Sequence, residues 1–159
     1  MPKEIERKYL LQSGEWKNHI DKKIIIKQGY LSSNPDSTVR IRLTNDKAFL
    51  TIKSKTIGIT RSEYEYAIPI VEAEELLHLC TKPLISKTRY IVIQNKSTWE
   101  VDIFEGENEG LEVAEIELVN PDQIIEKPNW LGEEVSNDPR YYNSSLAKHP
   151  FKDWDKIKP

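Results

Sequence analysis

The sequence predicts an α+β domain in which an antiparallel sheet closes into an eight-stranded β-barrel, a tunnel with a charged interior and short helices packed outside. Most of the chain consists of short segments typical of strands, and turn residues separate them. Side chains alternate between the two faces of a strand, so residues two apart share a face. Seven segments place two side chains of like charge two residues apart: Glu4/Glu6, Arg40/Arg42, Lys53/Lys55, Glu63/Glu65, Lys87/Arg89, Glu100/Asp102 and Glu115/Glu117.

The first half of the chain reads as a series of strands with one short helix. We expect strands at residues 4–11, 23–32, 38–44, 48–55 and 60–70. Ser13 is expected to cap a short helix that runs to about residue 20. A turn cluster at 34–37 and breaks at Asn45 and Gly58 leave short loops between the later strands. Short loops between consecutive strands imply antiparallel pairing.

The second half predicts three more strands and further short helices. Residues 72–81 form the clearest helix, with acidic residues in its first turn and Pro83 after its end. Strands are expected at 86–93, 98–104 and 111–119. Asn120 with Pro121, and Asp138 with Pro139, are typical starts of short helices, the second running to about residue 147. We expect one domain over 1–149 and an irregular tail over 150–159.

Closure of the sheet follows from the density of charge on one face. A solvated outer face would explain any single pair taken alone. Here nearly every position on that face is ionisable, and neighbours repeat the same sign, which costs stability unless something binds there. The interior of an eight-stranded barrel has room for side chains or one small ligand. The apolar side chains would then face outward, under the helices.

Composition excludes several classes of partner. The 159 residues carry 23 Lys and Arg against 26 Asp and Glu, a net charge of −3, so we expect neither nucleic acid nor a membrane as a partner. The single cysteine, Cys80, fits a small buried hydrophobe in a reducing compartment. The sequence has no secretory signal and no apolar run of about 20 residues. We therefore expect a soluble, cytoplasmic protein.

The charges that would line the tunnel suggest a polyphosphate with metal ions. Arginine guanidinium and lysine ammonium groups bind phosphate oxygens, and their high density here suits several phosphates. The residues are Lys8, Arg40, Arg42, Lys53, Lys87 and Arg89. Hard carboxylate donors without sulfur or imidazole favour Mg²⁺ or Mn²⁺ over zinc: Glu4, Glu6, Glu115 and Glu117. The three histidines have no ligand spacing, and we assign them no role.

These segments resemble a known family. Glu4-Ile-Glu6-Arg-Lys8 matches the ExExK signature of CYTH proteins, also called triphosphate tunnel metalloenzymes. Six more segments follow in the expected order: RIR at 40–42, TIK at 51–53, EYE at 63–65, KTRY at 87–90, EVD at 100–102 and EIE at 115–117. The ending GEEVSNDPRYYNSSLA resembles that of short bacterial members. The resemblance therefore covers nearly the whole chain.

The resemblance implies a tunnel that binds triphosphates with Mg²⁺ or Mn²⁺, and it implies roles for individual residues. Metal ligands would be Glu4, Glu6, Glu115, Glu117 and Asp102; catalytic residues would be Glu4, Glu6, Lys8, Lys87 and Glu117. The six basic residues named above would hold the phosphates. Glu63 and Glu65 match further acidic positions, and each of them, like Asp102, has an equal alternative as the counter-ion of a tunnel cation. Lys55, Arg61 and Arg140 are further phosphate candidates, with loop or surface placement as the alternative.

Hydrolysis of inorganic triphosphate to pyrophosphate and phosphate is the function we expect first. A metal-activated water would attack the terminal phosphorus. Class IV adenylate cyclase activity on ATP is the first alternative. A nucleoside or thiamine triphosphatase is the second, with stacking by Trp16, Trp99, Trp130 or Trp154 at the tunnel mouth. A non-catalytic polyphosphate-binding module is the third. A homodimer would be unsurprising in this family.

Overall fold

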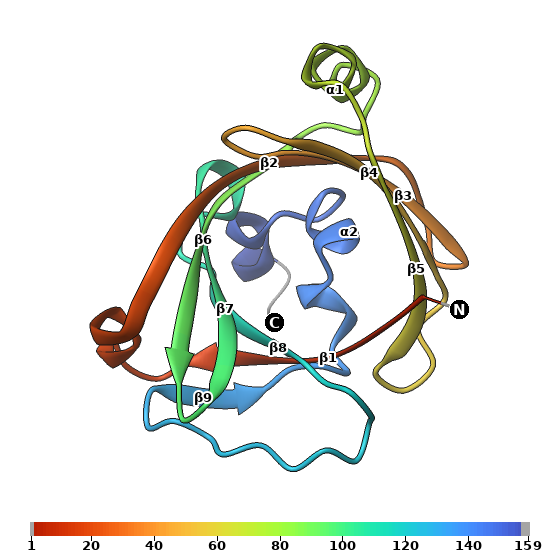
Figure 1. The fold of residues 1–159 in the computed structure, drawn as a ribbon. Helices are drawn as coiled ribbons and strands as arrows, with labels where there is room; N and C mark the ends of the chain where they lie inside the picture. Colours follow the sequence, from red (N-terminus) through yellow and green to blue (C-terminus); the bar gives the residue numbers. More distant parts are fainter. Residues whose placement is uncertain (1, 157–159) are drawn as a thin grey trace.

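Eight antiparallel strands form a closed ring in the computed structural model, which describes residues 2–156 (Figure 1). The sheet of the described residues has nine strands, of which β1 to β8 form the ring: β1 (Lys3–Leu11), β2 (Ile20–Asn34), β3 (Ser37–Leu43), β4 (Ala48–Ser54), β5 (Thr60–Ala67), β6 (Ile85–Gln94), β7 (Ser97–Phe104), β8 (Glu112–Glu117) and β9 (Leu131–Glu134). Their order is β5-β4-β3-β2-β6-β7-β8-β1-β9, and a further pairing of β1 with β5 closes the ring of the first eight. The predicted α+β ring of eight antiparallel strands is confirmed.

The first strand closes the ring because it changes partner along its length. Lys3 to Ile5 pair with β5, while Glu6 to Leu10 pair with β8. The short strand β9 pairs with the end of β1 at Tyr9 and Leu11. The two ends of the chain therefore meet at β1, which brings the first Glu-x-Glu pair beside the last.

Apolar side chains between the charged pairs turn outward into small cores. Ile41 lies between Arg40 and Arg42 and packs with Ala73 and Leu77 of helix α1 (Ile70–Leu77), which covers the outside of the ring. The cores behind β7 and β8 hold Val101 and Ile116 in the same way, under several buried aromatic rings. Alternation on the strands thus separates a charged interior from an apolar exterior, as predicted.

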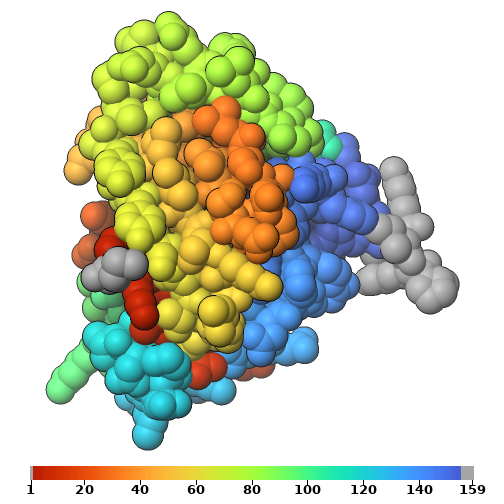
Figure 2. Space-filling model, turned by 90° about the vertical axis from the view of Figure 1, so that its right-hand side faces the viewer, coloured from red at the N-terminus to blue at the C-terminus, as the bar shows by residue number. Residues whose placement is uncertain are grey.

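The C-terminal segment lies across one end of the ring instead of packing outside it. It comprises η3 (Pro139–Tyr141), α2 (Asn143–Leu146) and η4 (Phe151–Lys156). It falls within the ring in Figure 1, and Figure 2, turned by 90°, shows it in blue on one side of the strands. Leu146 packs there against Ile85, Phe104 and Val113, apolar residues at this end of the strands. The expectation that all helices pack outside was wrong for this segment, because its apolar residues cover an apolar end of the tunnel.

Several element boundaries differ from the sequence-based expectations. Helix α1 spans Ile70–Leu77, earlier than the predicted 72–81, and Ser13 precedes a five-residue 3-10 helix, η1 (Glu15–His19). Asn120 starts a turn and no helix, and its side-chain oxygen accepts a hydrogen bond from the amide of Asp122 at 2.9 Å.

Near the end of the chain, part of the expected irregular tail is the 3-10 helix η4, and the last three residues of that tail lie outside the described residues. A further short 3-10 helix is η2 (Gly106–Asn108). None of the helices in residues 2–156 has the length and apolar character that a membrane crossing requires.

Candidate active site

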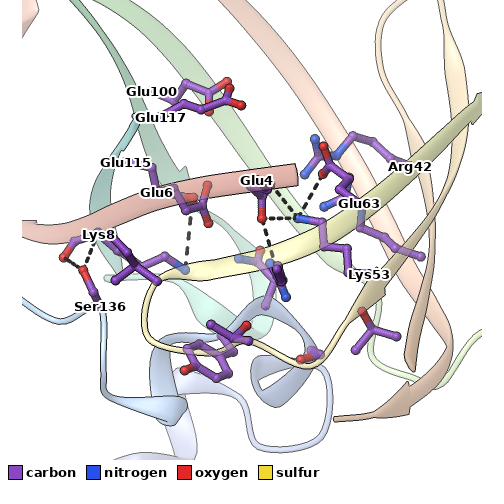
Figure 3. A pocket seen from close by; sticks show the side chains of 18 of the residues that line it. Glu4, Glu6, Lys8, Arg42, Lys53, Glu63, Glu100, Glu115, Glu117 and Ser136 are labelled. Atoms are coloured by element: carbon purple, nitrogen blue, oxygen red, sulfur yellow. Dashed lines mark hydrogen bonds and ion pairs between the residues drawn. The ribbon is translucent and has the colours of Figure 1, made fainter. Parts of the chain in front are cut away.

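The ring encloses a cavity of about 310 Å³, and nearly all the predicted site residues line it (Figure 3). They include all six predicted phosphate-binding cations and Arg61. The acidic residues of the lining are Glu4, Glu6, Glu63, Glu65, Glu100, Glu115 and Glu117. A cavity of this size lies at the small end of the range for small-molecule sites. The structure therefore brings together charges that are spread over more than a hundred residues of sequence.

Arg140 and Asp102 do not line the cavity. Arg140 is exposed and pairs with Asp138, with 2.7 Å between its Nη2 and Asp138 Oδ2, which is the surface placement given as the alternative for this residue. Asp102 is fully buried behind the lining. Its Oδ2 lies 2.7 Å from Lys87 Nζ, and Arg89 binds both its oxygens at 2.8 and 2.9 Å. Asp102 pairs with two tunnel cations through both its oxygens, which is the counter-ion alternative that the sequence left open.

Electrostatics support this assignment of Asp102. Burial alone would raise its pKa, but Arg89 and Lys87 hold the pKa of the Asp102 carboxyl at about 2. Burial lowers the pKa of Lys87 to about 7, with Asp102 opposing and Arg89 reinforcing that shift. The three groups thus form one buried ion network that fixes two of the cations in the lining.

Glu4 and the β5 carboxylates are also paired with cations. Both oxygens of Glu4 accept hydrogen bonds from Lys53 Nζ, at 3.0 and 3.1 Å, and Arg61 Nε donates to Glu4 at 3.0 Å. Glu63 lies 3.4 Å from Lys53, and Glu65 lies 3.9 Å from Arg40. Burial opposes ionisation of Glu4, but Lys53 and Arg61 hold its pKa far below the ordinary value. In this structure these three carboxylates pair with cations. For Glu63 and Glu65 this is the alternative that the sequence left open, whereas Glu4 was expected as a metal ligand.

The other carboxylates of the lining share one wall, formed by β1, β8 and β7. Glu6 lies directly opposite Glu117, and Glu115 lies opposite both Lys8 and Glu100 in the strand registers. Figure 3 shows Glu6 beside Glu115, and Glu100 beside Glu117. Burial, followed by the charges of Glu115 and Glu4, raises the pKa of Glu6 well above its usual value. We call this wall the acidic wall (Glu6, Glu100, Glu115 and Glu117). Arg89 binds Glu100 at 3.0 Å and Lys8 lies 3.9 Å from Glu115, so within the described residues Glu6 and Glu117 are its members without an ion pair.

The acidic wall fits a hard divalent cation in its donor chemistry. It offers only carboxylate oxygens, and like charges held in contact are relieved by a cation between them. Within residues 2–156, however, no three His, Cys, Asp or Glu side chains are gathered closely enough to form a preformed metal centre. The donors are therefore of the right type and on one wall, but they are spread along it.

The cations of the lining differ in how far they are neutralised. Within the described residues, Arg42 is the one member of the six predicted phosphate-binding cations that forms no ion pair. Its Nε donates to Gln28 Oε1 at 2.8 Å. Arg40 pairs weakly with Glu65, and its buried Nε has no hydrogen-bond partner in the described residues. Arg40 and Arg42 are thus the cations with most unused capacity for an anion.

Several residues of the site lie in the ending that resembles the family, but the sequence alone assigns them no role. Ser136, Tyr142, Asn143 and Ser144 enter the cavity lining from the C-terminal segment. Asn143 is the most connected of them, since its Oδ1 accepts hydrogen bonds from Lys87 and Gln28, both at 3.1 Å. Lys8 Nζ also donates to the carbonyl of Tyr141 at 2.9 Å. The position of Glu100, two residues before Asp102 on the same strand, was the available signal for its place in the lining.

The tryptophans do not provide a stacking platform for a base. Trp16, Trp99 and Trp130 are buried in the core outside the ring. Trp154 packs edge-on against Tyr141 and Phe151. None of the four lines the cavity among the described residues. The suggestion that one of them stacks on a substrate base at the tunnel mouth is therefore wrong.

Comparison with known proteins agrees with this geometry. A family model described as the CYTH domain matches residues 2–148. The chain belongs to the CYTH family. Among CYTH relatives, an inorganic triphosphatase of Acetivibrio thermocellus is 48% identical over 155 residues, which are 97% of this chain and 99% of that protein. An inorganic triphosphatase of Nitrosomonas europaea is 35% identical over 149 residues, 91% of this chain and 96% of that protein.

A solved CYTH structure has the same arrangement of strands. It is the crystal structure of an inorganic triphosphatase with a TM-score of 0.64 and 32% identity, and the match covers 90% of this chain and 96% of that one. The predicted family and the predicted ring of strands are both confirmed by these comparisons.

Proposed function

We propose that this CYTH protein hydrolyses inorganic triphosphate to pyrophosphate and phosphate in the lumen of its ring. The observation that carries the proposal is a cavity of about 310 Å³ inside the ring, lined both by the six cations and by the acidic wall. The two relatives named inorganic triphosphatase, which align over nearly the whole chain, support the same activity.

The cations would bind the phosphate chain and stabilise the transition state. Transfer of a phosphoryl group to water is catalysed mainly by positioning and by neutralising the charge on its equatorial oxygens. Arg42 has its two terminal nitrogens free of carboxylates, and Lys53, Lys87 and Arg89 are fixed by buried partners. Water supplies the oxygen that ends on the terminal phosphorus, and the bridging oxygen leaves with pyrophosphate.

The acidic wall would hold the divalent metal, and we place Glu6, Glu115 and Glu117 as its ligands with Glu100 beside them. Carboxylate oxygens alone favour Mg²⁺ or Mn²⁺. When bound, such an ion neutralises phosphoryl charge and lowers the pKa of a coordinated water. Glu4, which we expected to be a ligand, would instead keep Lys53 and Arg61 in place while it remains paired with them.

A substrate panel with product analysis tests this function. Tripolyphosphate, ATP, thiamine triphosphate and pyrophosphate would each be incubated with Mg²⁺ and with Mn²⁺, and the products resolved by ³¹P NMR and chromatography. We expect tripolyphosphate to be cleaved fastest, with equal amounts of pyrophosphate and phosphate. Cyclic AMP as the main product from ATP would instead establish the cyclase alternative, and binding without turnover of any substrate would establish a non-catalytic module.

A further inference from the structure

Two neutral amides link the phosphate-binding cations to the segment that covers the end of the ring. Gln28 on β2 is fully buried, accepts a hydrogen bond from Arg42 Nε at 2.8 Å, and donates to Asn143 Oδ1 at 3.1 Å. Asn143 Oδ1 also accepts from Lys87 Nζ at 3.1 Å. We call this chain, from Arg42 through Gln28 and Asn143 to Lys87, the amide relay.

The chemistry of its ends fixes the direction of every bond in the amide relay. Arg and Lys side chains are donors only, so both cations need an acceptor. Gln28 must therefore turn its oxygen toward Arg42, which leaves its NH₂ group to donate to Asn143. Asn143 must present its oxygen to both Gln28 and Lys87. Each amide thus has one orientation that satisfies its partners, and together they hold both cations without adding charge.

The absence of charge matters because these cations must bind an anion. A carboxylate beside Arg42 would hold it equally well but would neutralise it, as Glu4 does for Lys53. Arg42 has no ion pair within the described residues, and the relay contacts only its Nε. Both Nη groups therefore remain for a phosphate oxygen. The bidentate geometry of a guanidinium is useful only if its plane is fixed, and the bond to Gln28 fixes it.

We propose that Gln28 and Asn143 are positioning residues, which orient Arg42 and Lys87 for the phosphate chain and make that orientation depend on the seating of helix α2. The inference rests on the proposed function. The backbone carbonyl of Tyr141 binds Lys8 Nζ from the same segment, so three of the six cations are held directly or through Gln28 by residues 141–143.

Equilibrium binding of tripolyphosphate, measured by calorimetry with EDTA present, tests the positioning role without turnover or metal. We expect Gln28→Met and Asn143→Leu each to weaken binding about tenfold or more, the usual effect of losing a hydrogen bond to a charged group. Asn143→Asp keeps the acceptor for Gln28 and Lys87 but places a negative charge beside Lys87, so it should not recover the affinity lost in Asn143→Leu. Lys148→Ala, exposed just beyond the same helix, is the matched control and should bind like the wild type.

Steady-state kinetics separate positioning from a general effect on folding. Loss of orientation should raise the KM for tripolyphosphate about tenfold and, because these cations also stabilise the transition state, lower kcat as well, whereas partial unfolding lowers the apparent kcat and leaves KM unchanged. The double variant Gln28→Met/Asn143→Leu should be little worse than either single one, because each single change already breaks the relay.

The outcomes distinguish this inference from the function on which it rests. A wild-type protein that cleaves no triphosphate would overturn the proposed function. An active wild type whose Gln28→Met and Asn143→Leu variants keep its KM and affinity would overturn the positioning role alone. Losses of affinity that add fully in the double variant Gln28→Met/Asn143→Leu would also overturn the positioning role. Should Gln28→Met fail to fold, Asn143→Leu and Asn143→Asp still decide the matter, since Asn143 is only partly buried.

Discussion

Glu6 of β1 and Glu117 of β8 lie directly opposite each other inside the ring. Burial raises the pKa of both carboxyls, and neighbouring carboxylates raise them further. Like charges facing each other across two strands destabilise a sheet. A cation bound between them removes that cost, so this pair links stability to metal binding.

Replacing Glu117 by Gln should therefore stabilise the metal-free protein while abolishing most of its activity. We expect the free energy of unfolding to rise by at most about 1 kcal/mol. Turnover should fall about 100-fold or more, since mutation of a residue that only contacts a metal ligand already lowers metal affinity or activity by about 10–100-fold. Urea denaturation in EDTA and a phosphate-release assay check the two effects. Glu112→Gln, on the exposed face of the same strand, is the control and should change neither; a stable, fully active Glu117→Gln protein would remove this residue from the metal site.

Asp102→Asn should be far more destabilising than a surface change of the same kind. The variant leaves the buried cations Lys87 and Arg89 without their shared counter-ion, a loss of about 3–5 kcal/mol. Asp138→Asn, which breaks only the exposed pair with Arg140, should leave the denaturation midpoint unchanged. Similar midpoints for both variants in urea would show that the buried network contributes little.

Binding of triphosphate at about pH 8 should draw a proton onto Lys87. Burial in the folded protein lowers the pKa of Lys87 from 10.5 to about 7. Between pH 7 and pH 10.5 the Lys87 amine is therefore protonated in the unfolded chain and mostly neutral in the folded one, so the contribution of Lys87 to the free energy of unfolding rises with pH in this range. A bound phosphate favours the charged amine and reverses the shift. Calorimetry in two buffers of different ionisation enthalpy should show more proton uptake by the wild type than by Lys87→Arg. Equal uptake by both proteins would contradict the assignment.

Ligand should stabilise the protein according to the length of its phosphate chain. At 100 times the dissociation constant, binding adds roughly 2.7 kcal/mol to the free energy of unfolding. We expect Mg²⁺ with tripolyphosphate to raise the melting temperature well above Mg²⁺ with monophosphate at the same concentration. Differential scanning fluorimetry measures both, and equal shifts would indicate that the lumen is not shaped for a chain of phosphates.

The strand pattern of the sequence predicted which side chains share the lumen. Arg40 and Arg42 flank Ile41, and this alternation alone places two cations inside and one apolar residue outside. The acidic and basic segments on the other strands show the same alternation of inward charged and outward uncharged residues, which is why most of the lining could be predicted. Local alternation is sufficient for this purpose because it depends only on the geometry of a strand.

Roles that depend on distances in the folded ring could not be predicted in the same way. An aspartate such as Asp102 is a metal ligand or a counter-ion according to what lies within 3 Å of it. The amide relay joins Gln28 to Asn143 over 115 residues of sequence, and a single Asn carries no sign of such a contact. The seating of α2 against the end of the ring depends on packing with Ile85 and Phe104, which only the tertiary structure shows.

A crystal structure of the protein with tripolyphosphate and Mn²⁺ tests the central claim most directly, because Mn²⁺ is located by its anomalous scattering. The account predicts a phosphate chain inside the ring in contact with Arg42 and Lys87, and an anomalous peak at the wall that holds Glu6 and Glu117. Tripolyphosphate bound on the outer surface, or Mn²⁺ bound away from that wall, would contradict it.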